Sequence, residues 1–592
     1  MYANNKMLLH LISLLKQFGI KKVVVSPGCR HIPFVHSLEQ DKYFELFSVV
    51  DERSAAFFAM GLIQQSNEPV AVACTSGTAC QNFGSAVVES FYQKLPLLLL
   101  SGDRLDAYIN QNEDQSYDQV KSFKHCTKYT TKLPYVQSDV DEWHCNRLIN
   151  EALNELTIHG RGPVHISFPI VDFIGNYTVA NLPVARKISW HVATASPEQW
   201  GAIADRLRGK KIAIVVGQSV LFDDKLTKSI DNFCLNFDAI VLTDKIANCH
   251  CQNAISNTWV LLNTMNADDK AQFKPDVLMK IGGVNLFNPA IKNWLVGKTT
   301  HWQIGELGKV CDEYHVLSDV YEMPEWFFFE QITENATFEN SGNYAESWKL
   351  LSQLPVIPQT KDTNAIHAIG QLLAQLPNSS VLQLANSMSI RYADLFNIDP
   401  SIKVYCNRGT SGIDGSLSTA VGYASVHSKP LYYITGDLSF FYDMNALSIK
   451  HLSNKIRILL INNSGGAVLL QPGRVQVPVG QPINCAANNN VEAKRWVESC
   501  GFKYISAHSV EEINLGISQL LDEELDQPIM LEVFTDLIDD ASELYTYFST
   551  EANKRKAEIK MSFVERAKRK GVKLIKQKLP KEKIEAIKIL LK

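Results

Sequence analysis

Two polar motifs in the last third of the chain could hold a divalent cation. Gly436-Asp437 follows the apolar run Leu431–Thr435, and Asn462-Asn463 follows the next run, Ile456–Ile461. If these runs are neighbouring strands of a parallel sheet, the polar groups after them lie at one edge of it. A carboxylate, a side-chain amide and a backbone carbonyl would then form an all-oxygen site. Such a site suits Mg²⁺ (or Mn²⁺) that completes its coordination with phosphate oxygens and water.

Either motif alone would be an ordinary turn in most proteins, because Gly, Asp and Asn all favour turns. The ordered pair, with each member directly after an apolar strand, favours the metal site. Glycines beside both motifs would allow the backbone to approach a ligand closely.

The elements that must position these groups alternate between strand and helix in three stretches, which is typical of parallel sheets covered by helices. We therefore predict an α/β fold of three doubly wound parallel-sheet domains, at 1–185, 186–345 and 346–550, with a C-terminal extension at 551–592. A linker is expected at Asn340–Thr363. The predicted strands are Lys21–Ser26, Phe44–Val50, Val70–Cys74, Leu97–Ser101 and Arg161–Phe168, then Lys211–Gly217, Ala239–Thr243, Val277–Gly282 and Thr300–Ile304, then Ser380–Ala385, Lys403–Cys406, Pro430–Thr435, Ile456–Ile461 and Ile529–Phe534. Helices are expected at Ala55–Gln65 and Gly77–Tyr92.

The charge distribution restricts the possible partners. Residues 551–592 carry fifteen Lys and Arg against five acids, so the rest of this 592-residue chain, which is −4 in total, carries −14. A body of that charge has no general attraction to nucleic acid. The basic extension could bind an acidic partner or an anionic membrane surface. A solvated, partly helical extension is the simpler interpretation.

Composition and cysteine usage indicate a globular protein with reduced thiols. Hydrophobic residues make up 46% and charged residues 20%, and no apolar run approaches the ~18 residues of a membrane helix. His10 and Lys16 interrupt the apolar N-terminus, so we expect no secretion signal. Twelve cysteines without a regular spacing favour the cytoplasm.

Two further motifs are weak. Cys249-His250-Cys251 could be half of a zinc site, but no second pair stands at the required spacing. Gly282-Gly283 lacks the Gly-x-Gly-x-x-Gly pattern of a dinucleotide site.

The Gly436-Asp437 and Asn462-Asn463 pair resembles the metal motif of the thiamin-diphosphate-dependent enzyme superfamily. More narrowly, the chain resembles the MenD family, the 2-succinyl-5-enolpyruvyl-6-hydroxy-3-cyclohexene-1-carboxylate synthases, over roughly residues 1 to 545. The matching strings are Ser26–Arg30, Asp51–Phe57, Cys74–Ala79, Gly102–Arg104, Asp114-Gln115, Asn386–Met388 with Arg391, Asn407–Gly415 and Gly436–Phe440.

The resemblance implies thiamin diphosphate and Mg²⁺ as cofactors, bound in a fold with pyrimidine-binding, central and diphosphate-binding domains. Glu52, which begins a predicted helix directly after a strand, would bind the cofactor's N1′ nitrogen and be the catalytic acid. Ile413 would hold the cofactor bent. The implied cofactor-binding residues are Glu52, Ser387, Ile413, Gly436, Asp437, Leu438, Ser439, Asn463 and Gly465, and the implied metal ligands are Asp437, Asn463 and the carbonyl of Gly465.

The implied reaction is decarboxylation of 2-oxoglutarate and addition of the resulting four-carbon unit to isochorismate, in menaquinone biosynthesis. Both substrates are anionic, and four arginines stand at predicted strand ends, where guanidinium groups can bind carboxylates. A single arginine there would more often be a surface ion pair. The implied substrate-binding residues are Cys29, Arg30, Arg104, Gln115, Ser387, Arg391 and Arg408. The resemblance also implies at least a homodimer, and a dimer of dimers is possible, because the cofactor would lie between two subunits.

Several positions depart from the family pattern. Cys29 stands where Ser is usual, Pro289-Ala290 where a basic pair is expected, Val468-Leu469 where an aliphatic-Phe pair is usual, and Ser464 where Asn or Asp is common. These departures leave the acceptor substrate open. One alternative is a paralogous thiamin-diphosphate 2-oxo-acid decarboxylase or carboligase with another acceptor, for example in cell-surface polysaccharide synthesis. The other is a non-catalytic scaffold.

Overall fold

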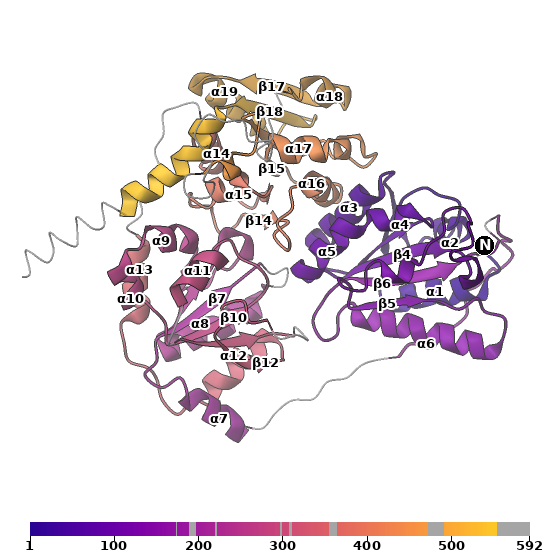
Figure 1. Cartoon of the computed structure of the whole chain (residues 1–592), viewed down its shortest axis with the longest axis horizontal. Coiled ribbons are helices and arrows are strands. Elements are labelled where there is room, and N and C mark those ends of the chain that lie inside the picture. The colour runs from indigo at the N-terminus through magenta and orange to yellow at the C-terminus, as the bar shows by residue number, and fades with distance from the viewer. Residues whose placement is uncertain are drawn as a thin grey trace, which may run out of the picture.

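The described part of the chain forms three α/β units, each built on a six-stranded sheet (Figure 1). The computed structural model describes residues 1–172, 174–188, 197–218, 222–295, 299–306, 311–353, 364–471 and 491–552. Every strand pairing in the three sheets is parallel. The predicted fold class is therefore confirmed.

The first and third sheets share one strand order. It is β2-β1-β3-β4-β6-β5 in the first sheet and β14-β13-β15-β16-β18-β17 in the third. The middle sheet runs β12-β11-β10-β7-β8-β9, which is the order of dinucleotide-binding folds. A strand order alone does not make a binding site, because function depends on the residues at the sheet edge.

The strands have the following bounds. In the first sheet they are β1 Lys22–Val25, β2 Glu45–Ser48, β3 Val70–Cys74, β4 Leu97–Asp103, β5 Tyr129–Lys132 and β6 Val164–Pro169. In the middle sheet they are β7 Ile212–Val216, β8 Ile240–Leu242, β9 Ala254–Ile255, β10 Val277–Ile281, β11 Thr300–Ile304 and β12 Leu317–Tyr321. In the third sheet they are β13 Val381–Leu384, β14 Lys403–Cys406, β15 Leu431–Gly436, β16 Ile456–Asn462, β17 Lys503–Ala507 and β18 Ile529–Phe534.

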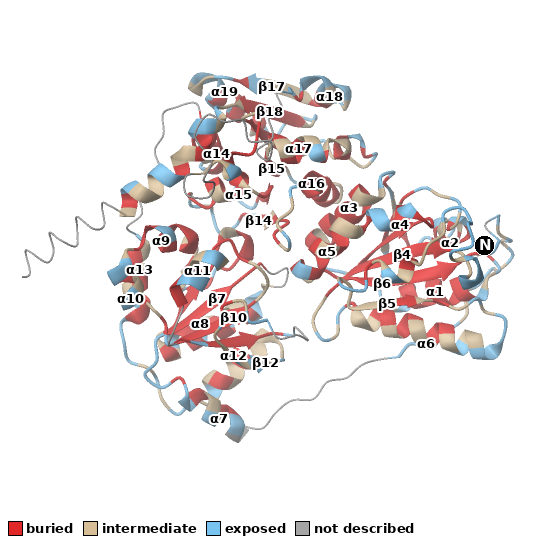
Figure 2. Ribbon diagram, viewed as in Figure 1, coloured by how far each residue is buried: buried red, intermediate tan, exposed pale blue. Residues whose placement is uncertain are grey.

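Helices cover the sheets, and their exposed residues lie on the sides that face away from the sheets (Figure 2). Those of the first unit are α1 Lys6–Gln17, α2 Ile32–Glu39, α3 Glu52–Ser66, α4 Thr78–Asn82, α5 Gly84–Gln93 and α6 Asp139–Glu155. Those around the middle sheet are α7 Pro197–Asp205, α8 Asp224–Phe237, α9 Thr258–Thr264, α10 Ala267–Gln272, α11 Asn288–Leu295, α12 Glu325–Glu334 and α13 Tyr344–Ser352. Those of the third unit are α14 Ala365–Leu373, α15 Met388–Ala393, α16 Ser416–Ala424, α17 Asp437–Tyr442, α18 Lys494–Ser499 and α19 Val510–Leu520. Short 3₁₀ turns are η1 Asp106–Tyr108, η2 Gln119–Lys121, η3 Lys245–Ala247, η4 Met444–Ser448 and η5 Ala467–Leu469.

Helices α3 and α16 join the first and third units by a backbone-to-backbone crossing. A Cβ on Gly61 of α3 would lie 2.2 Å from the carbonyl oxygen of Thr419, and one on Gly422 of α16 would lie 2.3 Å from that of Phe58. Only glycine allows two helices to approach so closely at this point. The crossing therefore sets how the two units sit against each other.

Three sequence expectations need correction. The predicted helix Gly77–Tyr92 is two helices, α4 and α5, interrupted at Phe83. The predicted linker Asn340–Thr363 contains the helix α13, and its residues 354–363 lie outside the described ones. Arg161–Phe168 was expected to close the first sheet, but β5 takes the edge position beside it.

The described cysteines are all free thiols. Within the described residues, no helix combines the length and the apolar character needed to span a bilayer. Helical residues 537–552 reach the middle unit, where Phe548 packs against Trp259 with ring centroids 5.1 Å apart. Residues 553–592, which make up nearly all of the predicted basic extension, lie outside the described residues. The predicted domain limits remain predictions.

Candidate functional site

A cavity of about 410 Å³ opens at the carboxyl edge of the third sheet. Its walls come from the ends of β15 and β16 and the segments that follow β13, β14, β15 and β16, together with one residue of α14. This is the edge where parallel sheets bind ligands. The predicted site residues that line it are Ser387, Arg391, Arg408, Ile413, Gly436, Asp437, Leu438, Ser439, Asn463 and Gly465.

Asp437 begins α17 at the end of β15 and is only 2% exposed. One carboxylate oxygen accepts the N–H of Leu438 at 2.8 Å, and Oδ2 has no hydrogen-bond partner among the described residues. Burial raises the pKa of Asp437 to about 6, and the N–H groups of Leu438 and Gly465 oppose the shift. A buried, half-satisfied carboxylate is suited to bind a cation.

Gly436 leaves room beside this carboxylate. Apart from its two chain neighbours, no described residue has an atom within 4 Å of where a Cβ at Gly436 would lie. Packing therefore does not require a glycine here, and Gly436 lines the same cavity as Asp437.

Asn463 and Gly465 form a tight loop opposite. Asn463 Nδ2 donates to Asp540 Oδ2 at 2.7 Å, and its Oδ1 accepts the N–H of Gly465 at 3.2 Å. The amide is therefore oriented with its oxygen toward Gly465, and one lone pair of that oxygen remains. Ser464 has φ of 62°, in the left-handed region that Asn and Asp tolerate best. This explains why Asn or Asp suits that position better than Ser.

Ile413 and Ser387 shape the remaining wall. Ile413 is 36% exposed although it lines the cavity, so a bulky aliphatic side chain projects into open space. Its carbonyl accepts a hydrogen bond from Ser439 Oγ at 2.7 Å, which fixes the loop. Ser387 has φ of 69° and stands at the N-terminus of α15. Positive φ in a serine is strained and is common at ligand sites.

Two arginines face the same cavity. Arg391 Nη1 donates to the carbonyl of Ser387 at 2.5 Å. Arg408 is 9% exposed, and its Nη1 donates to Asn386 Oδ1 at 3.2 Å. The buried Nε of Arg408 has no hydrogen-bond partner among the described residues. An anionic ligand in the cavity would satisfy it.

The other predicted residues gather at the carboxyl edge of the first sheet and do not line this cavity. Arg30 and Arg104 are neighbours: burial and the charge of Arg104 lower the pKa of Arg30. Arg104 also pairs with Glu113 at 2.9 Å. Gln115 is exposed, has φ of 52°, and lies against Gly77. Cys29, next to Arg30, is exposed.

Glu52 is at the same edge. It is the first residue of α3, whose N-cap Asp51 accepts the N–H of Ser54 at 2.9 Å. Its carboxylate is half-exposed and accepts a hydrogen bond from Asn82 Nδ2 at 3.2 Å. The predicted helix start after β2 is therefore confirmed. Within one chain, Glu52 is not among the residues that line the cavity.

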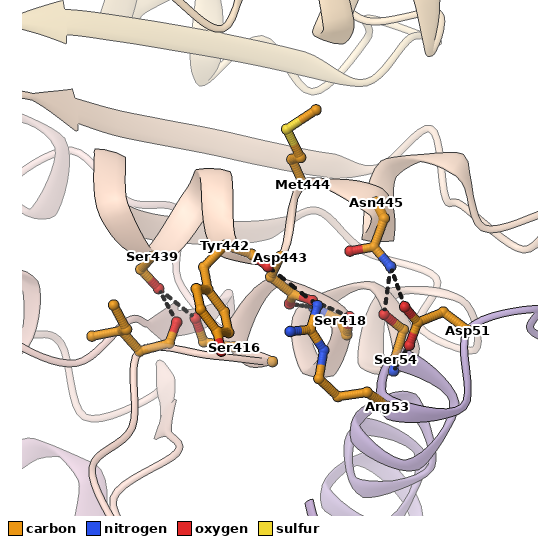
Figure 3. Close-up of polar contacts among 12 residues, drawn as sticks. Asp51, Arg53, Ser54, Ser416, Ser418, Ser439, Tyr442, Asp443, Met444 and Asn445 are labelled. Carbon is orange, nitrogen blue, oxygen red and sulfur yellow. Dashed lines mark hydrogen bonds and ion pairs between the residues drawn. The ribbon is translucent and has the colours of Figure 1, made fainter. Parts of the chain in front are cut away.

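The end of α17 and the turn after it contact the start of α3 (Figure 3). Asp437 stands at its first turn, and Asp443 caps its end, where it accepts the N–H of Ser418 at 2.7 Å and lies 3.8 Å from Arg53. Burial raises the pKa of Asp443 to about 6. Two residues later, Asn445 Nδ2 donates to Asp51 at 3.2 Å and to Ser54 at 3.0 Å. The start of α3, where Glu52 lies, is therefore held by the end of α17 and by the turn η4 that follows it.

The departures from the family pattern are in different places. Val468 and Leu469 line the cavity, so they take part in its shape. Pro289-Ala290 lies in the first turn of α11. Cys249 and Cys251 have their sulfur atoms 3.7 Å apart, and among the described residues no group of three or more His, Cys, Asp or Glu is placed to hold a metal.

Sequence reasoning missed the apolar wall of the cavity, Ile369, Tyr392 and Ile461, and it missed Glu89, which holds the Arg408 loop. Ile369 belongs to α14, a helix that the sequence interpretation left unassigned. Its apolar pattern at helical spacing was the available signal. Glu89 offered no local signal of this role, because its partners in that loop, Gly409 and Thr410, are more than 300 positions away.

The chain is similar to known proteins both in sequence and in fold. Residues 7–122 match the family model described as "Thiamine pyrophosphate enzyme, N-terminal TPP binding domain". In fold, the chain is similar to benzoylformate decarboxylase from Polynucleobacter necessarius, with a TM-score of 0.68 over 91% of this chain and 99% of that one, at 16% identity.

Curated relatives are much nearer in sequence. The 2-succinyl-5-enolpyruvyl-6-hydroxy-3-cyclohexene-1-carboxylate synthase of Phocaeicola vulgatus is 38% identical, over 94% of this chain and 100% of its own length. Those of Bacteroides thetaiotaomicron and Flavobacterium johnsoniae are 37% and 32% identical, over 93% and 91% of this chain and 99% and 97% of their own lengths. Similarity of that extent, together with the strand-end motifs, means that the chain belongs to the family of 2-succinyl-5-enolpyruvyl-6-hydroxy-3-cyclohexene-1-carboxylate synthases.

Proposed function

We propose that the protein decarboxylates 2-oxoglutarate and adds the resulting four-carbon unit to isochorismate, forming 2-succinyl-5-enolpyruvyl-6-hydroxy-3-cyclohexene-1-carboxylate for menaquinone synthesis. One observation carries the proposal: Asp437 and Arg408 line one cavity, and each is buried. Among the described residues, Asp437 Oδ2 and Arg408 Nε have no hydrogen-bond partner. That pairing fits a cation bound with an anionic cofactor, next to an anionic substrate.

The residues present fit thiamin diphosphate with Mg²⁺. Asp437 Oδ2, the side-chain oxygen of Asn463 and the carbonyl of Gly465 would hold the metal, and the open space beside Gly436 would take the diphosphate. Ile413 would support the bent cofactor. When bound, thiamin diphosphate supplies a thiazolium that can take up the electron pair left by a departing carboxyl group.

The protein's own side chains would hold one proton and orient the anionic substrates. Glu52 would hold a proton at its carboxylate, close to the cofactor's pyrimidine nitrogen. Arg391 and Arg408 would bind substrate carboxylates, with Ser387 as a polar contact. Arg30, Arg104, Gln115 and Cys29 would bind the second anionic substrate. Guanidinium groups stay charged throughout and bind carboxylates in a fixed fork, so they fix orientation and exchange no proton.

These roles require two copies of the chain. The proposed metal ligands line the cavity, whereas Glu52, at the first-sheet edge, does not line it. We propose a homodimer, or a dimer of dimers, in which the first-sheet edge of one subunit covers the cavity of the other.

The test follows CO₂ release from 2-oxoglutarate with thiamin diphosphate and Mg²⁺, with and without isochorismate. The proposal predicts release coupled to isochorismate consumption. Release only with another 2-oxo acid or acceptor would instead support a paralogous carboligase. Val468 and Leu469, which depart from the family pattern, line the cavity and could change which substrate it accepts. No release with any 2-oxo acid would support a scaffold.

A further inference from the structure

Glu89 is a buried acid that no step of the proposed reaction uses. It lies on α5 of the first unit and is 2% exposed. A buried carboxylate is costly unless every lone pair is hydrogen-bonded. The four donors that bind this carboxylate therefore indicate its structural role.

Three of the four donors belong to the loop after β14, in the third unit. Glu89 Oε1 accepts the N–H of Gly409 at 2.8 Å, and Oε2 accepts the N–H and the Oγ1 of Thr410 at 2.7 and 2.8 Å. Gln93, one turn further along α5, donates its Nε2 to Oε1 at 2.6 Å. Each carboxylate oxygen thus accepts two hydrogen bonds, and none of these four donors is a Lys, Arg or His side chain.

The loop also touches the helix backbone. A Cβ on Gly409 would lie 2.6 Å from the carbonyl oxygen of Glu89 and 3.1 Å from the N–H nitrogen of Gln93. The chain just before the loop is held from the middle unit, because Gln218 Nε2 donates to the carbonyl of Cys406 at 2.7 Å. All three units meet where the loop leaves its strand.

Arg408 lies between these two anchor points. Its neighbours on one side, Gly409 and Thr410, are tied to Glu89, and Cys406 on the other side is tied to Gln218. Arg408 lines the cavity, and its buried Nε has no partner among the described residues. We infer that Glu89 is a positioning residue for the 2-oxo-acid substrate, because it holds the loop so that Arg408 presents its guanidinium to a substrate carboxylate. This inference rests on the proposed function.

Glutamine cannot replace this glutamate. Since each carboxylate oxygen has two donors, an amide in either orientation would point its NH₂ group at a backbone N–H of Gly409 or Thr410. Charge-assisted hydrogen bonds are also about twice as strong as neutral ones. Glu89→Gln should therefore loosen the loop while it keeps the shape of the side chain.

The first measurement is amide hydrogen exchange of the full-length protein with thiamin diphosphate and Mg²⁺. Glu89→Gln should speed exchange in peptides that cover 407–412 by about tenfold. Glu346→Gln, which changes an exposed acid on α13, should leave exchange in those peptides unchanged. Equal protection in Glu89→Gln and the unchanged protein would overturn the inference.

The second measurement separates positioning from general structural support. Glu89→Gln should raise KM for 2-oxoglutarate about tenfold, a loss in the range of charged hydrogen bonds, while the Kd for thiamin diphosphate changes by less than about twofold. The double variant Glu89→Gln with Arg408→Gln should have nearly the same KM as Arg408→Gln alone, because coupled residues are not additive. Additive losses would mean that Glu89 acts elsewhere, and the inference would fail.

Thr410 provides a milder variant should Glu89→Gln fail to fold. Thr410→Val removes one of the four hydrogen bonds and should raise KM about threefold, and Thr410→Ser should restore it. Equal KM values in the Val and Ser variants would overturn the inference. If the unchanged protein does not use 2-oxoglutarate, the proposed function fails. If it does and Glu89→Gln keeps a normal KM, only this inference fails.

Discussion

The first and third sheets have the same strand order, but their carboxyl edges differ. The third-sheet edge encloses a cavity with a buried carboxylate. The first-sheet edge carries the half-exposed Glu52 and the half-buried Arg30 and Arg104, which do not line that cavity. One architecture thus supports two edges that differ in chemistry, because the residues that follow the strands, and not the strands themselves, carry the proposed functional groups.

The largest expected effect is at the first-sheet edge. Glu52→Gln keeps the helix start, which depends on the Asp51 cap, but removes the acid. We expect turnover to fall by about a thousandfold or more, as for loss of a general acid or base, with the fold and cofactor affinity kept. Steady-state rates and titration with thiamin diphosphate check this. Glu68→Gln, an exposed acid beyond the other end of α3, is the control, and near-normal turnover in Glu52→Gln would remove Glu52 from the mechanism.

The matching change at the third-sheet edge should act on binding. Asp437→Ala removes the carboxylate whose Oδ2 has no partner among the described residues. We expect affinity for Mg²⁺ and thiamin diphosphate to fall about a hundredfold. Calorimetric titration of the cofactor over a range of Mg²⁺ concentrations measures this, with Asp526→Ala, an exposed acid of the same unit, for comparison. An unchanged Mg²⁺ requirement contradicts the assigned role.

A change at the crossing of α3 and α16, which joins the first and third units, should lower the stability of the protein. Gly422→Ala places a methyl group 2.3 Å from the carbonyl oxygen of Phe58, so α3 and α16 must separate. We expect a loss of about 2 to 3 kcal/mol in the free energy of unfolding, typical of overpacking. Denaturant unfolding measures it. Gly84→Ala, where a Cβ would meet its nearest atom at 4.0 Å, should be nearly neutral, and equal stabilities of the two variants would count against a rigid joint.

A smaller effect is expected at the third-sheet edge when the pH is changed, because the proposed metal ligand Asp437 titrates. Burial raises the pKa of Asp437 from 3.8 to about 6. In the metal-free protein the protonated carboxyl favours the fold, and this contribution is lost as pH rises from about 4 through about 6. Bound metal needs the ionised form, so apparent Mg²⁺ affinity should fall up to about tenfold per unit below about pH 6.

Melting temperatures give the readout for this pH effect. Mg²⁺ and thiamin diphosphate together should raise the melting temperature more at about pH 8 than at about pH 5, by ligand linkage. The Asp437→Asn variant should lose this difference. An equal rise at both pH values in the unchanged protein contradicts the prediction.

The sequence predicted those parts of the site that are local to one strand end. Gly436-Asp437 and Asn463 could be placed because each follows a buried apolar strand, and the three-sheet fold followed from the same runs. Edge strands were missed, since β12 and β17 are only partly buried and lack the continuous apolar pattern of central strands. Helix α13 was taken for a linker although its buried Tyr344, Trp348 and Leu351 repeat at helical spacing.

What the sequence could not predict depends on contacts between distant segments. Glu89 and Thr410 are 321 positions apart, and the α3–α16 crossing joins Gly61 to the carbonyl of Thr419. Such contacts exist only after the sheets have formed, so no local pattern of residue types encodes them.

The central claim is that one active site uses the first-sheet edge of one subunit and the cavity of another. Mixing inactive Glu52→Gln and Asp437→Ala proteins under conditions of subunit exchange tests it directly. Random exchange makes about half of the dimers mixed, and each mixed dimer has one intact site, so about a quarter of normal activity should return. If the mixture stays as inactive as its components after exchange has been verified, the shared site is contradicted.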